Sequence, residues 1–319
     1  MKILTIGGRG FIGKKLVERL IEEKNQVDIL SRSGDHESTD KNDYITFIKC
    51  DLLDATFDFE ELFANYDVIF NCAGELNDES LMYSLHVEAT RRMILACKKV
   101  GKAQKRKIHW VQLSSVGAYG VSQPNANTKR IVTEETLVAP VGPYEVSKTL
   151  ADKMVMKAAD EFFSYSILRP SNVYGTSMPN DSIRQWGRMI HKGMFVYIGL
   201  PGAIVTYVHV DDVVDALLLC GFDDRAKNET FNISNDCDQE EFASTIATIL
   251  NTKKPRLRVP ETLMRLITTL FSGVKKFPLS HSRVDALVAR TKYSTDKLRH
   301  VLGYAPKRDV LKTINEVFR

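Results

Sequence analysis

Three side chains of this sequence are suited to acid–base chemistry at an oxygen atom. Tyr144 and Lys148 lie four residues apart, so on a helix they share one face. A tyrosine of ordinary pKa, about 10, is a weak acid or base at neutral pH, and a neighbouring ammonium group lowers that pKa. Ser115 ends a predicted strand and offers a hydroxyl donor to a carbonyl oxygen. We predict that Ser115, Tyr144 and Lys148 form the catalytic set.

The same Tyr-x-x-x-Lys spacing occurs a second time, at Tyr293 and Lys297. We expect this second pair to lie in a C-terminal helical segment, far from the ends of the sheet strands. Tyr144 instead follows the predicted strand 107–113, which ends next to Ser115. The context therefore favours the first pair.

The first thirteen residues predict the kind of cofactor that this catalytic set would use. An apolar strand at residues 2–6 leads into Gly7-x-x-Gly10-x-x-Gly13, and residues 14–23 have helical spacing. A strand, a glycine turn and a helix in this order are the context of a dinucleotide-binding loop. In such a loop the first glycine makes the tight turn, the second lets the backbone approach a pyrophosphate, and the third lets helix and strand pack closely.

The end of the second predicted strand bears on which dinucleotide is bound. Residues 26–30 form this strand, and Ser31 and Arg32 follow it. An acidic residue there favours NAD, whereas an arginine accommodates the 2′-phosphate of NADP. Arg9 in the glycine loop adds a second positive charge. We therefore expect NADP(H) rather than NAD(H).

Short apolar segments alternate with predicted helices through the first half of the chain. They cover residues 2–6, 26–30, 45–50, 66–74, 107–113 and 164–170. This alternation predicts an α/β fold, here a Rossmann-type doubly wound parallel sheet. Its ligand crevice lies beyond the carboxyl ends of the strands. Small or polar residues stand at five of those ends: Gly7, Ser31, Asp51, Ala73 and Ser115.

The chain changes character after residue 171, where short strands and helices alternate irregularly. We expect a dinucleotide-binding domain from residues 1–171 plus about 209–235. A smaller, mostly helical substrate-binding domain would take residues 172–208 plus 236–319.

Composition excludes several classes of protein. A net charge of +4 is too small to imply nucleic-acid binding. The five cysteines are dispersed and the seven histidines have no ligand spacing, so we expect no metal, no disulfide framework and a reducing cytoplasm. There is no signal-peptide pattern, and no apolar run approaches the ~20 residues of a membrane span.

Taken together, the motifs make a family resemblance visible. The sequence resembles an extended short-chain dehydrogenase/reductase of the NAD(P)-dependent epimerase/dehydratase family. The resemblance rests on segments in the family's order: 7–13, Asp51-Leu52, 71–74, 113–120, Tyr144-x-x-x-Lys148, 168–175, 208–213 and 302–306. Ser115, five residues before Gly120, matches the family's catalytic serine better than Ser114 does.

The resemblance implies a set of binding residues. The cofactor would contact Gly7, Arg9, Gly10, Phe11, Ile12, Gly13, Ser31, Arg32, Asp51, Leu52, Cys72, Ala73, Gly74, Tyr144, Lys148, Pro170 and Val173. The substrate would contact Ser115, Tyr144, Asn172, Arg184 and Arg283. Helices 79–100 and 144–160 resemble those that pair in the family's dimers, so we expect a homodimer.

Departures from the family pattern reduce the number of activities that the resemblance allows. Ser115 and Val116 stand where dehydratases carry Asp and Glu, which disfavours dehydration. His86 replaces a usual asparagine, and Val205 replaces an arginine that contacts the diphosphate of nucleotide sugars. The resemblance implies a nucleotide-sugar 4-keto reductase. The alternatives are a nucleotide-sugar 4-epimerase, a hydroxysteroid-type or other small-ketone dehydrogenase, and a non-catalytic dinucleotide-binding regulator.

Overall fold

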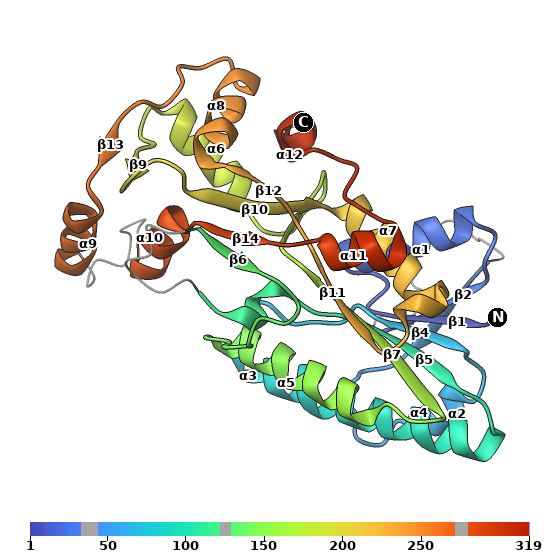
Figure 1. Ribbon diagram of the computed structural model, residues 1–319. Helices are drawn as coiled ribbons and strands as arrows, with labels where there is room; N and C mark the ends of the chain where they lie inside the picture. The colour runs from blue at the N-terminus through green and yellow to red at the C-terminus, as the bar shows by residue number, and fades with distance from the viewer. Residues whose placement is uncertain (33–43, 122–128, 272–279, 319) are drawn as a thin grey trace.

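The centre of the molecule is a seven-stranded parallel sheet with strand order β11-β7-β5-β4-β1-β2-β3 (Figure 1). The computed structural model describes residues 1–32, 44–121, 129–271 and 280–318. The sheet strands are β1 (Ile3–Ile6), β2 (Val27–Ser31), β3 (Ile45–Lys49), β4 (Val68–Asn71), β5 (Ile108–Leu113), β7 (Phe163–Pro170) and β11 (Glu229–Ile233). This order confirms the predicted Rossmann-type fold.

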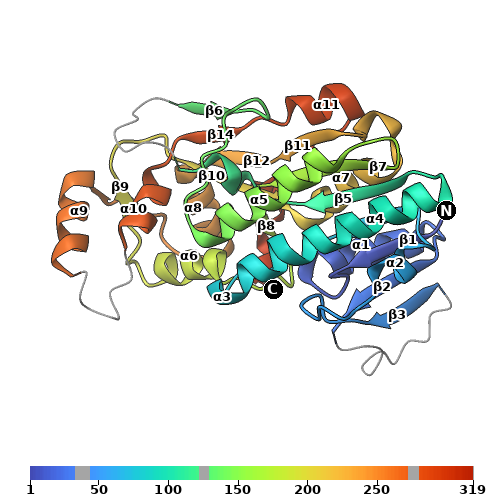
Figure 2. The ribbon, with the colours of Figure 1, turned by 90° about the horizontal axis from the view of Figure 1, so that it is seen from below.

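Helices cover both faces of the sheet, which explains why its central strands are almost continuously buried (Figures 1 and 2). One face carries α2 (Phe59–Phe63), α4 (Thr90–Gln104) and α5 (Pro143–Ala158). The other carries α1 (Phe11–Glu22), α7 (Val210–Phe222) and α11 (Asp296–Leu302). Each helix packs its apolar stripe on the sheet, so the sheet forms a rigid platform for the residues at its strand ends.

A smaller body stands beyond the carboxyl ends of the strands. It contains a three-stranded sheet, β12-β10-β8, and the two-stranded sheet β13-β9. Its elements are β8 (Asn172–Tyr174), α6 (Ser182–His191), β9 (Tyr197–Ile198), β10 (Ile204–His209), β12 (Asn235–Asp238), α8 (Gln239–Ile249), β13 (Arg258–Val259), α9 (Glu261–Leu270), α10 (His281–Val288) and α12 (Val310–Thr313). A separate hydrophobic cluster around Phe242 and Ile183 fills it.

The chain crosses between the two bodies several times. The residues that follow α10 return to the large sheet, where Leu298 and Leu302 of α11 join its hydrophobic core. The division into two domains at the boundaries given above remains a proposal.

The location expected for the second Tyr-x-x-x-Lys pair is wrong. Tyr293 ends strand β14 (Thr291–Tyr293), which pairs in parallel with β6 (Arg130–Val132). The centre of its ring lies 6.5 Å from the centre of the Tyr119 ring, which follows Ser115 at the end of β5. Lys297 lies on α11 and forms an ion pair with Glu229. The two residues therefore do not share a helical face.

The predicted helix from residue 79 to residue 100 is present and extends to Gln104. It begins as α3 (Glu79–Tyr83), widens into a π-helical turn at Ser84–Ala89, and continues as α4. Turns of this kind often occur at functional sites. This one carries His86, whose side chain is buried.

The described residues contain neither a membrane-spanning helix nor a cluster of metal-binding side chains. Within them, no helix is both long and apolar enough to cross a bilayer. Nor do three or more His, Cys, Asp or Glu side chains gather there in a way that could hold a metal ion.

Candidate active site

The glycine loop between β1 and α1 forms an open cradle, and a side chain at Gly7 or Gly13 would collide with the surrounding backbone. Gly7 has a φ of +75°, and a Cβ built on it would lie 2.8 Å from the backbone nitrogen of Ala73. A Cβ on Gly13 would lie 2.2 Å from the carbonyl oxygen of Gly7. Helix α1 has no side-chain cap and no acidic residue in its first turn, so its amide groups remain for an anion. This geometry fits a dinucleotide pyrophosphate.

The end of β2 offers polar and cationic groups beside this cradle. The hydroxyl oxygen of Ser31 is buried without a hydrogen-bond partner among the described residues, as expected where a ribose would dock. The Arg9 guanidinium lies over the Phe47 ring, 4.7 Å from its centre. Arg32 is exposed at the strand end, and the exposed Lys49 pairs in register with Ser31. Lys49 is a third cation that the sequence reasoning missed.

Several of the expected cofactor contacts have a packing role in this structure. Phe11 packs against the core of the smaller body, and Ile12, Cys72 and Val173 pack against the core of the large sheet. Only their backbone groups and side-chain edges are left for a cofactor. Leu52 and Pro170 are also buried, whereas Asp51 is exposed and accepts a hydrogen bond from the Leu53 amide.

Lys148 lies in the interior next to the path expected for the cofactor. Its Nζ donates a 2.6 Å hydrogen bond to the carbonyl oxygen of Leu113, at the end of β5. A Cβ built on Gly74 would lie 4.0 Å from this Nζ and 3.6 Å from Nε2 of His86. The turn after β4 and helix α5 therefore meet at Lys148.

The two adjacent serines after β5 have different roles. Ser114 is buried, and its Oγ donates a 2.7 Å hydrogen bond to Oδ2 of Asp152. Ser115 is partly exposed, and its Oγ accepts a hydrogen bond from the Gly117 amide. A Cβ on Gly117 would lie 3.3 Å from Ser115 Oγ and 2.7 Å from Cγ of Glu145. The Ser115 turn thus packs against the first turn of α5, which carries Tyr144.

The electrostatics around Tyr144 differ from the sequence-based expectation. Burial raises the pKa of Tyr144 to about 12, and the negative charges of Glu145 and Asp152 act in the same direction. Burial also lowers the pKa of Lys148, while the carboxylate of Asp152 opposes that change. The expected lowering of the Tyr144 pKa by the Lys148 ammonium group is therefore wrong for this structure, because desolvation of the phenol is the largest cause and raises that pKa.

A buried ion pair holds the catalytic elements together. Nε of Arg169 donates to Oδ2 of Asp152 at 3.0 Å, and the Arg169 Nη1 donates to the Tyr119 hydroxyl at 3.0 Å. Asp152 stands on α5, Arg169 at the end of β7, and Tyr119 just after the Ser115 turn. Sequence reasoning missed this network, although Asp152 follows Lys148 by four residues and so shares its helical face.

His86 joins the turn after β4 to helix α5. Its Nε2 accepts a 2.8 Å hydrogen bond from the Glu75 amide, so its Nδ1 carries the proton and donates to the Ser147 Oγ, also at 2.8 Å. The Ser147 hydroxyl in turn donates to the Tyr144 carbonyl oxygen. Burial and the charge of Lys148 lower the pKa of His86 to about 3. His86 is therefore neutral, with both ring nitrogens in hydrogen bonds.

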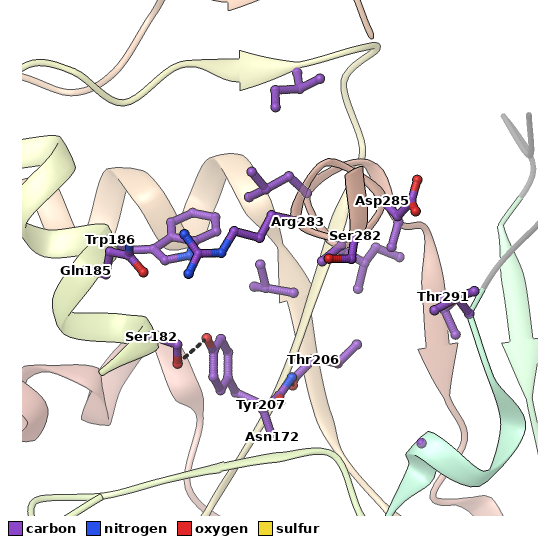
Figure 3. Close-up of a pocket in the computed structure, with 18 of the residues that line it drawn as sticks. Asn172, Ser182, Gln185, Trp186, Thr206, Tyr207, Ser282, Arg283, Asp285 and Thr291 are labelled. Atoms are coloured by element: carbon purple, nitrogen blue, oxygen red, sulfur yellow. Dashed lines mark hydrogen bonds between the residues drawn. The ribbon is translucent and has the colours of Figure 1, made fainter. Parts of the chain in front are cut away.

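A cavity of about 730 Å³ begins beside the Ser115 turn and extends between α6 and α10 (Figure 3). Gly117 and Glu145 line its catalytic end, and Asn172 lies on its floor. Two of the three expected substrate contacts outside the catalytic set reach this cavity. Asn172 donates to the Thr206 carbonyl oxygen, and Arg283 extends from α10 toward Trp186.

Arg184 does not line this cavity. Its guanidinium is directed toward the carbonyl oxygens of Thr176, Met178 and Asn180, at 3.3–3.5 Å. Arg283 is therefore the better placed of the two arginines. Trp186, which follows Arg184 on α6, is a cavity residue that the sequence reasoning missed.

Comparisons with known proteins bear on the family and the fold of this chain. The sequence pattern described as "NAD dependent epimerase/dehydratase family" matches residues 3–234. A mouse (Mus musculus) protein, sterol-4-alpha-carboxylate 3-dehydrogenase (decarboxylating), is 26% identical, with 96% of this chain and 86% of that protein covered. The UDP-glucose 4-epimerase of Vibrio cholerae is also 26% identical, with 99% and 93% covered.

Solved structures share the fold over the whole length. UDP-glucuronic acid 4-epimerase from Bacillus cereus, in complex with NAD, superposes with a TM-score of 0.73 at 19% identity, covering 99% of this chain and 98% of that one.

Proposed function

The chain belongs to the NAD dependent epimerase/dehydratase family, and on that premise we propose that it transfers a hydride between a nicotinamide cofactor and a secondary alcohol or ketone. It is an enzyme of the short-chain dehydrogenase/reductase type. The observation that carries the proposal is the packing of the Ser115 turn on the first turn of α5, the helix that carries Tyr144 and that places Lys148 Nζ beside the Gly74 turn. Gly117 and Glu145, the neighbours of this set, line the end of a large cavity.

The proposed roles follow from the position of each group. The partly exposed Ser115 hydroxyl polarises the substrate oxygen, and Tyr144 donates a proton to it during ketone reduction. The cofactor supplies the hydride at its nicotinamide ring. Lys148, buried under the Gly74 turn, holds the nicotinamide ribose and places a positive charge next to the phenol. In alcohol oxidation the same groups act in reverse.

We propose that the reacting centre is C4 of a sugar, and that the enzyme is a 4-keto reductase acting on a nucleotide-activated hexose. Relatives named for UDP-sugars, across nearly the full length, support this assignment. A 4-epimerase would use the same residues, but it would oxidise and re-reduce one sugar with a retained cofactor. Net consumption of NADPH distinguishes the two: the reductase consumes it, and the epimerase does not.

A second candidate is a hydroxysteroid-type or other small-ketone dehydrogenase. A specific observation favours it: Val205 is buried in the cavity wall where a nucleotide-sugar enzyme would be expected to place an arginine. The mouse relative is named for a sterol substrate. A silent dinucleotide-binding regulator is disfavoured, because the chain keeps Ser115, Tyr144 and Lys148 and a cavity adjoins the Ser115 turn.

We further propose NADP(H) as the preferred cofactor and a homodimer as the assembly. The choice of NADP(H) is supported by three cationic side chains near Ser31, because they would favour a 2′-phosphate. These are Arg9, Arg32 and Lys49. Exposed apolar side chains on α4 and α5, including Leu95 and Leu150, support the second.

Tyr144→Phe tests the catalytic proposal. NADPH oxidation with a ketone substrate should fall by about 10²–10⁴-fold, because a positioned acid contributes that much. Cofactor binding, followed by NADPH fluorescence, should stay near that of the parent protein, which shows that the variant is folded. Full turnover by Tyr144→Phe would contradict the assignment.

A further inference from the structure

Glu145, the residue that follows Tyr144, lies at the catalytic end of the cavity with its carboxylate unengaged. Its side chain is partly exposed and lines the cavity. The described lining residues include two acidic ones, and the other, Asp285, forms an ion pair with Arg265 at 2.7 Å. The Glu145 side chain forms no hydrogen bond or ion pair with any residue in the ranges that the structure describes. One carboxylate is therefore left for a substrate.

Two glycines provide the space that the Glu145 side chain occupies. A Cβ built on Gly117 would lie 2.7 Å from Cγ of Glu145, and one built on Gly142 would lie 2.6 Å from its Oε2. Both distances are shorter than van der Waals contact, so a larger residue at either position would displace the carboxylate. Gly142 also has a φ of +110°, which favours glycine. The Ser115 turn and the turn before α5 therefore define where this carboxylate lies.

The charge of Glu145 acts on the reacting groups. The residue lies in the first turn of α5, where the helix dipole favours a negative charge. Burial is the main cause that raises the pKa of Tyr144 to about 12, and the charge of Glu145 is the next. Because electrostatic interactions weaken with distance, this influence indicates that the carboxylate lies close to the phenol. A substituent beside the reacting carbon would lie in the same field.

Donors and acceptors at this end of the cavity fall into two sets. The hydroxyls of Ser115 and Tyr144 are the donors proposed for the reacting oxygen. Asn172 donates through its Nδ2 to the Thr206 carbonyl oxygen at 3.0 Å, which leaves its Oδ1 as an acceptor. The carboxylate of Glu145 can only accept. A partly buried carboxylate without a donor is unfavourable, so the substrate is expected to supply one.

We propose that Glu145 is a specificity-determining residue that selects the substituent on the carbon next to the reacting carbon. It binds a hydrogen-bond donor there, either a hydroxyl or, more tightly, an ammonium group, and it repels a carboxylate. A hexuronic acid, which has a carboxylate on the carbon next to C4, is therefore a poor substrate. The inference rests on the proposed hydride transfer, because that reaction defines the reacting carbon.

Three small alcohols test this selection without assuming the rest of the substrate. The probes are trans-1,2-cyclohexanediol, trans-2-aminocyclohexanol and trans-2-hydroxycyclohexanecarboxylate. They share one ring and one secondary alcohol, and the neighbouring group is neutral, cationic or anionic. Ligand-observed NMR titration of the NADP⁺-bound protein measures the Kd of each probe. Formation of NADPH, followed by its fluorescence, measures kcat/KM for oxidation.

We expect the parent protein to bind the ammonium probe most tightly and the carboxylate probe most weakly. Their Kd values should differ by at least about tenfold, which is equivalent to 1.4 kcal/mol. Glu145→Gln keeps the shape of the side chain and removes its charge. It should therefore abolish the preference for the ammonium probe over the diol and bring the carboxylate probe close to the diol. Glu161→Gln, at an exposed site beyond the end of α5, is the matched control and should keep the parental order.

Ratios between the probes separate recognition from a structural role of Glu145. A weaker helix terminus or a changed pKa of Tyr144 would affect the three probes alike, so the ratios of their Kd values would stay constant. Unchanged ratios in Glu145→Gln would overturn the inference. Equal affinities of the parent protein for the ammonium and carboxylate probes, or no binding of the ammonium probe, would overturn it as well.

Failure of this inference differs from failure of the proposed function. If the probes bind in the expected order, and neither they nor a nucleotide-linked hexose exchange a hydride with the cofactor, the hydride-transfer proposal is wrong and recognition by Glu145 stands. If the probes are oxidised with kcat/KM ratios that Glu145→Gln does not alter, the function stands and the role of Glu145 is wrong.

Discussion

The Ser114 hydroxyl donates a 2.7 Å hydrogen bond to the buried carboxylate of Asp152, while the adjacent Ser115 hydroxyl stays at the surface of the active site. Ser114 therefore stabilises the buried carboxylate, whereas the Ser115 hydroxyl is accessible to a substrate. Substitution of each should produce a different defect.

Ser115→Ala should lower kcat for ketone reduction by about 10²–10³-fold, the usual effect of removing one donor to a reacting oxygen. Its free energy of unfolding should fall by no more than about 1 kcal/mol, because only the acceptor of the Gly117 amide is lost. Ser114→Ala should lower the free energy of unfolding by about 1–3 kcal/mol, because a buried carboxylate loses a donor. Steady-state kinetics and urea unfolding of both variants measure these effects. The reverse pattern would exchange the roles of the two serines.

Alanine substitutions at Gly10 and Gly13 should also have different effects, one mainly on cofactor binding and the other mainly on stability. A Cβ on Gly13 would lie 2.2 Å from the Gly7 carbonyl oxygen, whereas a Cβ on Gly10 would have 3.3 Å to the same atom. Gly13→Ala should therefore lower the melting temperature of the cofactor-free protein by several degrees. Gly10→Ala should lower that temperature less, because a 3.3 Å approach needs only a small shift of the loop. It should also weaken cofactor binding, because its methyl group enters the space of the pyrophosphate. Differential scanning fluorimetry with and without NADPH distinguishes the two effects.

His86 should make the protein less stable in acid. Its pKa is lowered to about 3 in the folded state, against about 6.5 for an ordinary histidine. Between these values the unfolded chain binds a proton that the folded chain does not, so stability falls as the pH drops from about 6.5 toward 3. The contribution of this one group cannot exceed about 1.4 kcal/mol per pH unit.

His86→Asn should flatten the fall in unfolding free energy between pH 6 and pH 4. His300→Asn, on the exposed face of α11, is the control for loss of one histidine. Guanidinium unfolding at three pH values measures the slopes. Identical slopes in the parent and His86→Asn proteins would refute the prediction.

Cofactor choice should depend on the cations around Ser31. The double variant Arg9→Ala/Arg32→Ala should lower the ratio of catalytic efficiency with NADPH to that with NADH by at least about tenfold, since each lost charge pair contributes on the order of 1 kcal/mol. Arg91→Ala, which removes an exposed arginine of α4, should leave the ratio unchanged. An unaltered ratio in the double variant would remove the support for NADP(H).

Local sequence patterns predicted the fold well, and they predicted the glycine turn between β1 and α1. The alternation of buried strands with helices specifies a parallel sheet, and strand, glycine turn and helix are contiguous in the chain. The position of Ser115 could be placed at a strand end for the same reason. Each of these features is determined by neighbours within about twenty residues.

The substrate side depends on contacts that local patterns do not encode. Tyr293 looked helical by spacing, yet it pairs through β14 with β6, about 160 residues earlier. Arg283 and Trp186 face one cavity from α10 and α6, and nothing in either segment indicates the other. The pKa of Tyr144 was likewise misjudged, because burial is a property of the assembled fold.

The late position of α10 and β14 in the chain has a consequence for assembly during synthesis. The glycine loop and the strands around it are all made before residue 235, whereas one wall of the cavity comes after residue 280. A nascent chain can therefore complete its cofactor cradle before it has a cavity to receive a substrate. The C-terminal segment is therefore the last part of the chain to supply a wall of the cavity.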